Sequence, residues 1–286
     1  EFEFAHELFS KPEDMKAVKE ADCVVVCLGH DSVTEKENSD RTFELPYGQV
    51  DYLRTVLKYN KNVVVVLNGG GGIEMASWLP EVKAVLMAWY PGQQGGLAVS
   101  EIITGKVSPS GRLPISIEKN FSDNPVSESY YENVDRIRTK NINPYSRVEY
   151  REGLFVGYRG YEAQNKAPLF PFGYGLSYSE FEYSDLKITP SETGCVVTLN
   201  VKNVGRMTAS ETVQVYVGDQ ECSLVRPKKE LKGFEKVSLA PGQTKTVPVT
   251  LGENAFRFYD PVCKAPGFFC ADRWLDAGYQ CVFQTN

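Results

Sequence analysis

The sequence is poor in histidine and lacks both a long apolar run and an excess of basic residues. His6 and His30 are its only histidines, and neither Ser77 nor Ser100 lies in the G-x-S-x-G pattern that would favour a Ser–His–Asp hydrolase. The 31 Lys and Arg are outnumbered by 37 Asp and Glu, which argues against a nucleic-acid partner. No apolar stretch approaches the roughly 18 residues that span a bilayer, so no membrane partner is expected.

The cysteines and the glycine run indicate neither a metal nor a cofactor. Cys263, Cys270 and Cys281 are close enough in sequence for one disulfide, but their spacing matches no zinc motif, and the total of seven leaves one thiol free. Gly69–Gly72 follows an apolar run, where phosphate-binding loops occur, yet neither the G-x-G-x-x-G nor the Walker pattern is present. A tight turn after a strand explains these glycines.

The compartment stays open. Residues 1–10 have no basic stretch followed by an apolar core, so they are not expected to be a signal peptide, although the chain can be the mature part of an exported protein. A periplasmic or secreted location is favoured over a cytoplasmic one.

Composition and pattern divide the 286 residues into three parts. Residues 1–120 alternate β-branched runs with helical patterns, which predicts an α/β domain with a mainly parallel sheet. Residues 121–182 are rich in Tyr, Pro and Gly, and they predict a connecting segment that packs along a surface or lines a cleft. Residues 183–286 contain alternating strands at the spacing of an all-β, immunoglobulin-like sandwich.

In the first part, strands are expected within 21–29, 61–72, 83–96 and 110–117, and helices at 46–60, 73–82 and 97–105. The run at 21–29 is almost wholly apolar, which predicts a strand buried on both faces, with Cys23 and Cys27 as small buried hydrophobes. The loop after such a strand lies at the carboxyl edge of the sheet, where open α/β sheets bind their ligands.

That loop is unusually acidic for a short connection. Its candidate site residues are His30, Asp31, Glu35, Glu37, Asp40 and Arg41. Paired carboxylates at a binding edge are typical of enzymes that cleave glycosidic bonds, in which a protonated acid donates to the leaving oxygen. A solvated loop explains the same composition, and the spacing alone favours it. His30 is expected to make hydrogen bonds within the loop rather than to act as a catalyst.

Four segments have distinctive patterns. They are TEKENSDRTFELPYGQ (34–49), AWYPGQQGG with SPSGRLPISI (88–96 and 108–117), VEYREGLFVGYRGYE with PLFPFGYGLSYSEF (148–162 and 168–181), and VRPKKELKGFEKVSLAPGQTK (225–245). In this order they resemble the C-terminal half of glycoside hydrolase family 3, the β-glucosidase and β-xylosidase family. The resemblance covers most of residues 15–255.

The resemblance implies an α/β sandwich at about residues 15–120 and a fibronectin-III-like sandwich at 183 to about 255. It also implies hydrolysis of β-linked glucosides or oligosaccharides from non-reducing ends with retention of configuration. The family's aspartate nucleophile comes from an N-terminal barrel of about 250 residues, which this chain does not contain. The barrel domain of the same enzyme is therefore an expected partner, and the chain alone is expected to be inactive.

The resemblance also suggests roles for residues of the acidic loop. Glu37, three residues before Asp40, is the first choice for the general acid/base, and Glu35 is the alternate because the family's loop varies in length. Asp40 and Arg41 are expected to form an ion pair that shapes the loop and orients the glutamate. His30 and Asp31 are expected to bind substrate or to shape the same loop.

Two alternatives stay open at this point. A β-glucosidase is the favoured activity and a β-xylosidase of the same family is the alternative, because most residues that select the sugar would lie in the barrel. A non-catalytic unit that binds carbohydrate or a partner protein is favoured by the many aromatic residues between Tyr130 and Tyr183, although core packing accounts for most of them.

Overall fold

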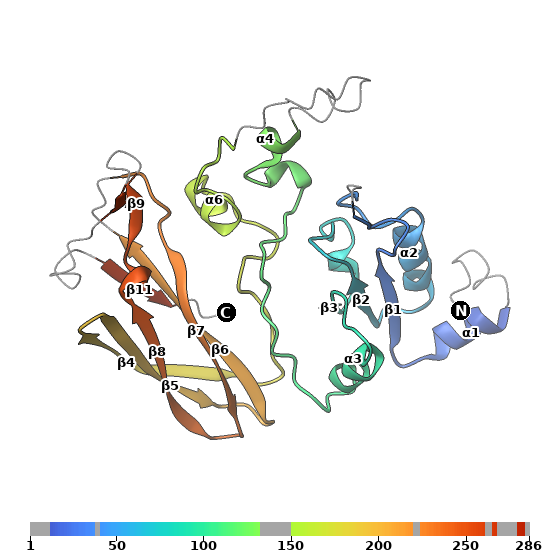
Figure 1. Cartoon of the computed structure of the whole chain (residues 1–286). Helices are drawn as coiled ribbons and strands as arrows, with labels where there is room; N and C mark the ends of the chain where they lie inside the picture. Colours follow the sequence, from blue (N-terminus) through green and yellow to red (C-terminus); the bar gives the residue numbers. More distant parts are fainter. Residues whose placement is uncertain are drawn as a thin grey trace. The chain divides into compact units, whose positions relative to one another are not determined.

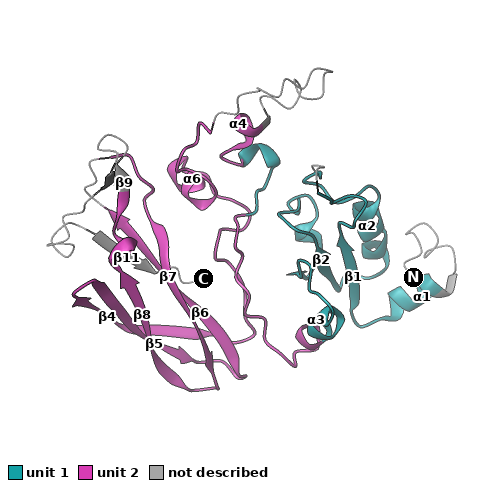
Figure 2. Ribbon diagram, viewed as in Figure 1, with its two compact units in different colours: residues 1–100, 117–123 teal, residues 101–116, 124–286 magenta. Residues whose placement is uncertain are grey.

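The computed structural model describes residues 12–37, 41–131, 150–219, 224–260, 265–267 and 279–283. Contacts divide the chain into two compact units (Figure 2), residues 1–100 with 117–123 and residues 101–116 with 124–286. Unit 1 is α/β and unit 2 is mainly β, so the predicted fold class is confirmed. The three-part division at residues 120 and 182 stays a prediction.

Unit 1 is built on a three-stranded parallel sheet in the order β1-β2-β3 (Figure 1). The strands are β1 (Val24–Gly29), β2 (Val63–Asn68) and β3 (Ala84–Met87). β2 is central, and its Val63, Val65 and Leu67 side chains are fully buried. Since the strands are parallel, the loops that follow them leave the sheet at one edge.

The helices of unit 1 follow the predicted positions in part. They are α1 (Pro12–Glu20), α2 (Gln49–Tyr59), the first six residues of α3 (Gly95–Ile103) and the 3₁₀ helices η1 (Leu79–Glu81) and η2 (Phe121–Asp123). α2 buries Leu53, Val56 and Leu57, which recur at helical spacing. α3 ends before Gly105, whose φ of 73° is a conformation that glycine adopts without strain.

The prediction that the first strand is buried on both faces is wrong. Val25 is 42% exposed, and Cys23 and Cys27 are exposed rather than buried. β1 lies at an edge of the sheet and alternates buried with exposed residues. In the described part of the chain, one face of this strand is therefore open, which a wholly apolar sequence does not reveal.

Two further predicted elements do not form. Residues 73–82 make turns and η1 instead of a helix, and the Glu74 carboxylate accepts hydrogen bonds from the backbone and hydroxyl of Ser77, a local alternative to helical bonding. Residues 110–117 form no strand. Leu113 instead exchanges backbone hydrogen bonds with Gly173 and Tyr174, both at 2.8 Å, so residues 101–116 group with unit 2.

The β-sandwich of unit 2 consists of two antiparallel three-stranded sheets, ordered β4-β5-β8 and β11-β6-β7. Its strands are β4 (Phe181–Ser191), β5 (Gly194–Asn203), β6 (Ala209–Asp219), β7 (Glu230–Leu239), β8 (Thr244–Gly252) and β11 (Tyr279–Phe283). A short pair, β9 (Phe258–Asp260) and β10 (Ala265–Gly267), follows the 3₁₀ helix η3 (Glu253–Ala255). Alternate residues of β5, β6 and β8 fill one hydrophobic core.

The connecting part of unit 2 contains α4 (Ser127–Tyr131) and α6 (Tyr158–Ala163). Side-chain contacts hold α6 against the sandwich. The Tyr158 ring stacks on Phe172 with centroids 4.8 Å apart, and its hydroxyl accepts the backbone N–H of Leu231 at 2.9 Å. Glu162 pairs with Lys229 at 3.0 Å. The aromatic residues named here therefore serve as packing groups.

Two buried polar groups stabilise unit 2. Arg112 forms an ion pair with Glu211 of β6, and each side chain is only 9% exposed. Asn203 is fully buried. Its amide donates to the carbonyls of Met207 and Leu239, and its oxygen accepts the Ser179 hydroxyl, so the polar atoms of this buried side chain are satisfied.

Candidate active site

The acidic loop starts from a fixed point at the end of β1. The Gln49 side chain of α2 accepts from the Gly29 N–H and donates to the Gly29 carbonyl, both at 2.8 Å. Gly29 has a φ of 148°, and a Cβ there would lie 2.0 Å from the Asn68 carbonyl oxygen. Glycine is therefore required here, because only its backbone can approach β2 so closely.

Asp31 shapes the first turn of the loop. Its Oδ1 accepts hydrogen bonds from the Val33 N–H at 2.9 Å and from the N–H and hydroxyl of Thr34 at 2.9 and 3.0 Å. The Glu35 N–H then donates to the Asp31 carbonyl at 2.8 Å. The hydrogen bonds from Thr34 are the main reason that the pKa of the Asp31 carboxyl lies below its ordinary value.

The Glu35 carboxylate is held by three groups from separate segments. Arg41 Nε lies 3.1 Å from its Oε1. The backbone N–H of Gly70 and the hydroxyl of Tyr90 donate to its Oε2 at 2.9 and 2.6 Å. The loop after β1 is thereby attached to the segments that follow β2 and β3.

The glycine run accommodates this carboxylate and its partner. A Cβ at Gly70 would lie 2.7 Å from Glu35 Oε1, and one at Gly71 would lie 2.5 Å from Arg41 Nη2. Arg41 Nη2 also donates to the Gly72 carbonyl at 2.6 Å. The run is therefore more than the tight turn expected from the sequence, because two side chains of the acidic loop pack against its backbone.

Arg41 makes two further contacts within the acidic loop, one with the backbone of Thr42 and one with His30. Its Nη1 donates to the Thr42 carbonyl at 3.1 Å and lies 3.4 Å from His30 Nε2. The sequence predicts an ion pair between Arg41 and Asp40, but Asp40 lies outside the described residues. Among the described residues, Arg41 pairs with Glu35.

His30 is buried, with only 6% of its surface exposed. Burial lowers the pKa of its imidazole, the Arg41 charge lowers it further, and the charges of Glu35 and Asp31 oppose the change. Its Nδ1 is buried and has no hydrogen-bond partner among the described residues. These surroundings favour the neutral imidazole, with Nε2 facing the Arg41 guanidinium.

Glu35 and Glu37 have different surroundings. Burial, the largest single influence on Glu35, raises the pKa of its carboxyl, but the hydrogen bonds from Tyr90 and Gly70 and the Arg41 charge together outweigh it. The net effect is a lowered pKa, so Glu35 is an ionised anchor at neutral pH. Glu37 is exposed.

Tyr90 was not singled out from the sequence, although the AWYPGQ motif contains it. It follows β3, whose carboxyl end shares the sheet edge with that of β1. The preceding Trp89 has a φ of 54°, which is strained for an aromatic residue. The hydrogen bond to Glu35 raises the pKa of the Tyr90 hydroxyl. The sequence feature that could have identified Tyr90 is the position of its motif directly after a predicted strand, at the same edge of the sheet as the acidic loop.

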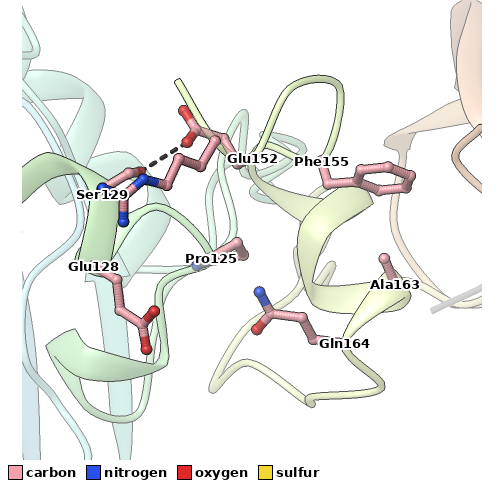
Figure 3. A pocket seen from close by; sticks show the side chains of 8 residues that line it. Pro125, Glu128, Ser129, Glu152, Phe155, Ala163 and Gln164 are labelled. Atoms are coloured by element: carbon pink, nitrogen blue, oxygen red, sulfur yellow. Dashed lines mark hydrogen bonds between the residues drawn. The ribbon is translucent and has the colours of Figure 1, made fainter. Parts of the chain in front are cut away.

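Unit 2 has a separate hollow of about 370 Å³. Its lining residues are Pro125, Glu128, Ser129, Arg151, Glu152, Phe155, Ala163 and Gln164. In Figure 3 the Glu128 carboxyl and the Gln164 amide face one another across it, and the Ser129 hydroxyl donates to Glu152 at 2.7 Å. The volume falls at the small end of the range for ligand sites, roughly 300–1,000 Å³.

The described ranges contain neither a candidate metal centre nor a candidate membrane-spanning helix. No three His, Cys, Asp or Glu side chains in these ranges are grouped so as to hold a metal ion. None of the helices described has the length and apolar character needed to cross a bilayer. Cys263 and Cys270 lie outside the described residues, so the expected disulfide stays a prediction.

Sequence comparison decides the family. A profile described as the glycosyl hydrolase family 3 C-terminal domain matches residues 9–178, which is more than half of the 286 residues. The chain belongs to glycosyl hydrolase family 3. A second profile, the fibronectin type III-like domain, matches residues 211–266. Both domains implied by the motifs are thereby confirmed.

Curated family 3 relatives cover nearly the whole chain. The thermostable beta-glucosidase B of Acetivibrio thermocellus is 42% identical over 257 residues, covering 88% of this chain but 32% of the relative. The exo-alpha-(1->6)-L-arabinopyranosidase of Bifidobacterium breve is 40% identical over 251 residues, covering 86% of this chain and 31% of the relative. The chain thus spans about a third of the length of these family 3 proteins.

A solved structure gives the same result for the fold. The GH3 beta-glucosidase of Bifidobacterium adolescentis superposes with a TM-score of 0.80 at 36% identity. The match covers 91% of this chain and 38% of that one. The α/β unit and the β-sandwich are therefore arrangements found in an experimentally determined family 3 protein.

Proposed function

We propose that this chain is part of a retaining, exo-acting β-glycosidase of family 3 and that its substrates are β-linked glucosides or oligosaccharides. Family membership and relatives named as beta-glucosidases support the reaction class. The acidic loop at the carboxyl edge of a parallel sheet supports the position of the site. A β-xylosidase is the alternative within the family.

Glu37 is proposed as the general acid/base. The observation that carries this choice is the difference between the two glutamates. Glu35 has a lowered pKa and three partners, so it is a poor proton donor and a good anchor. Glu37 is exposed two residues further along, where its carboxyl can reach a substrate. It would protonate the leaving oxygen and then deprotonate the attacking water.

The remaining catalytic carboxylate would come from a barrel domain of the same enzyme. A retaining mechanism needs a nucleophile about 5–5.5 Å from the acid/base. We propose an aspartate of the barrel for this role.

Complementation tests this proposal. The chain is mixed with a separately produced barrel domain from a family 3 relative, and hydrolysis of an aryl β-glucoside is measured for the mixture and for each part. Activity in the mixture alone supports the proposal. Activity of the chain by itself, or an inactive mixture in which the two parts demonstrably bind each other, contradicts it.

The hollow in unit 2 supports a second candidate, a non-catalytic carbohydrate-binding unit. Carboxylates, an amide and a hydroxyl line it and can bond sugar hydroxyls. Isothermal titration of the chain with cellobiose distinguishes the two ideas when Glu152→Gln is compared with Glu37→Gln. Binding that is weakened only by Glu152→Gln favours the second candidate, and the absence of binding excludes it for this sugar.

A further inference from the structure

Tyr90 combines an anchored hydroxyl with an exposed ring. The hydroxyl donates to Glu35 at 2.6 Å, yet 57% of the residue's surface is exposed. A Cβ at Gly70 would lie 3.4 Å from Tyr90 Cε2, so one edge of the ring lies against the glycine run. The ring is thus fixed in position at the sheet edge while much of its surface remains available for contact.

The backbone before Tyr90 supports this fixed position. Trp89 has a φ of 54°, a conformation that is strained for an aromatic residue and persists only where its surroundings enforce it. The Asn68 side chain at the end of β2 donates to the Trp89 carbonyl at 3.1 Å. Together with the bond to Glu35, this contact holds both sides of the turn.

We propose that the Tyr90 ring forms an aromatic wall of the leaving-group subsite and thereby selects substrates whose leaving group is itself a ring, a second sugar or an aryl group. The acid/base must lie beside the leaving oxygen to protonate it. Glu37 is two residues from Glu35, to which Tyr90 is bonded. The exposed ring is thus bonded to the loop that carries the proposed acid, and in this proposal it contacts the part of the substrate that departs.

This inference rests on the proposed function, and its chemistry is that of stacking. The flat apolar face of a sugar or an aryl ring packs on an aromatic side chain, whereas a methyl group gains little from the same surface. A substrate pair that shares glucose and differs only in the leaving group isolates the effect. Cellobiose and methyl β-glucoside are such a pair.

The test compares Tyr90→Leu, which removes the ring, with Tyr90→Phe, which keeps the ring and loses the hydroxyl. In the complemented enzyme, we expect Tyr90→Leu to lower the ratio of kcat/KM for cellobiose to that for methyl β-glucoside about tenfold. Tyr90→Phe should leave that ratio within about twofold. Tyr59→Leu, at a tyrosine of α2 that is 41% exposed, is the matched control and should not change it.

Two results overturn the inference: an unchanged ratio in Tyr90→Leu, or an equal fall in Tyr90→Phe. If the complemented enzyme hydrolyses neither substrate, the proposed function fails separately, and Tyr90 is then judged by binding. In that case cellobiose is titrated into the chain alone, and the ring protons of Tyr90 are followed by NMR. A saturable shift supports the aromatic wall, and its absence up to the solubility limit of cellobiose overturns it.

Discussion

Arg41 and Glu35 form an ion pair whose Nε–Oε1 distance is 3.1 Å, and both side chains pack against the glycine run that follows β2. This pair joins two residues that lie on either side of Glu37 in the acidic loop. Because the Glu35 carboxylate is paired with Arg41, Glu35 is less suited than Glu37 to donate a proton. The pair also makes the attachment of the loop dependent on the ionisation of Glu35.

The first prediction concerns pH. The pKa of Glu35 is lowered in the folded chain, so its ion pair contributes stability that is present above the ordinary value of 4.5 and lost as pH falls through the folded value. The difference in unfolding free energy between the wild type and Glu35→Gln should therefore be constant above about pH 5.5 and shrink below about pH 4.5. Urea unfolding across this range measures it, and a difference that grows on acidification would contradict the assignment.

A second prediction concerns the glycine run. Gly70→Ala places a methyl group 2.7 Å from Glu35 Oε1, so the carboxylate must move away from its partners. We expect a loss of about 1–3 kcal/mol in unfolding free energy and faster hydrogen exchange in the loop after β1. Gly96→Ala is the control, because nothing lies within 4 Å of a Cβ there. Equal effects of the two changes would refute the role of Gly70.

The buried pair of Arg112 and Glu211 gives a third prediction. Arg112→Met leaves a buried carboxylate without its cation and should lower the unfolding free energy by about 3–5 kcal/mol. The Tyr183 hydroxyl also donates to Glu211, at 2.8 Å. The triple change Arg112→Met, Glu211→Leu and Tyr183→Phe replaces every one of these polar groups and should be milder than Arg112→Met alone. Chemical denaturation measures both, and a more severe triple variant would sink the explanation.

Asn203 gives a fourth prediction, in the core of the sandwich. Asn203→Asp turns the donor that faces the Met207 and Leu239 carbonyls into an acceptor. We expect it to cost more than Asn203→Ala, which should itself cost at least about 2 kcal/mol because buried carbonyls lose their partners. The partly exposed Asn200→Ala is the control, with an expected loss below about 1 kcal/mol. Thermal unfolding of the three variants ranks them, and an Asp variant as stable as the wild type would disprove the assignment.

The fold could be predicted where burial follows a simple period. The helical pattern at 46–60 and the alternating pattern after residue 183 each fit one kind of element, and the structure forms α2 at Gln49–Tyr59 and an antiparallel β-sandwich. The predictions of secondary structure and burial fail where contacts with distant segments determine them. The 110–117 segment has a strand-like sequence, but its backbone bonds to Gly173 and Tyr174. The open face of β1 depends on what covers the sheet, and a single strand's sequence does not contain that information.

From the sequence, only those residues of the candidate site that lie within the acidic loop could be predicted. His30, Glu35 and Arg41 are neighbours in sequence, and the structure brings them together. Gly70 and Tyr90 lie 35 and 55 positions from Glu35, and only the parallel sheet places them beside it. The resemblance made Glu37 the first choice and Glu35 the alternate without any contact to separate them, whereas the structure gives Glu35 three partners and leaves Glu37 exposed, which supports the proposed roles.

The central claim is that Glu37, and not Glu35, protonates the leaving group. The most direct test measures the glycosylation rate of the complemented enzyme with methyl β-glucoside, which needs a proton donor, and with 2,4-dinitrophenyl β-glucoside, which does not. Glu37→Gln should slow the first reaction about 10²–10⁴-fold and the second far less, whereas Glu35→Gln should slow both to a similar extent. A selective loss of the methyl glucoside reaction in Glu35→Gln, with Glu37→Gln unimpaired, would contradict the account.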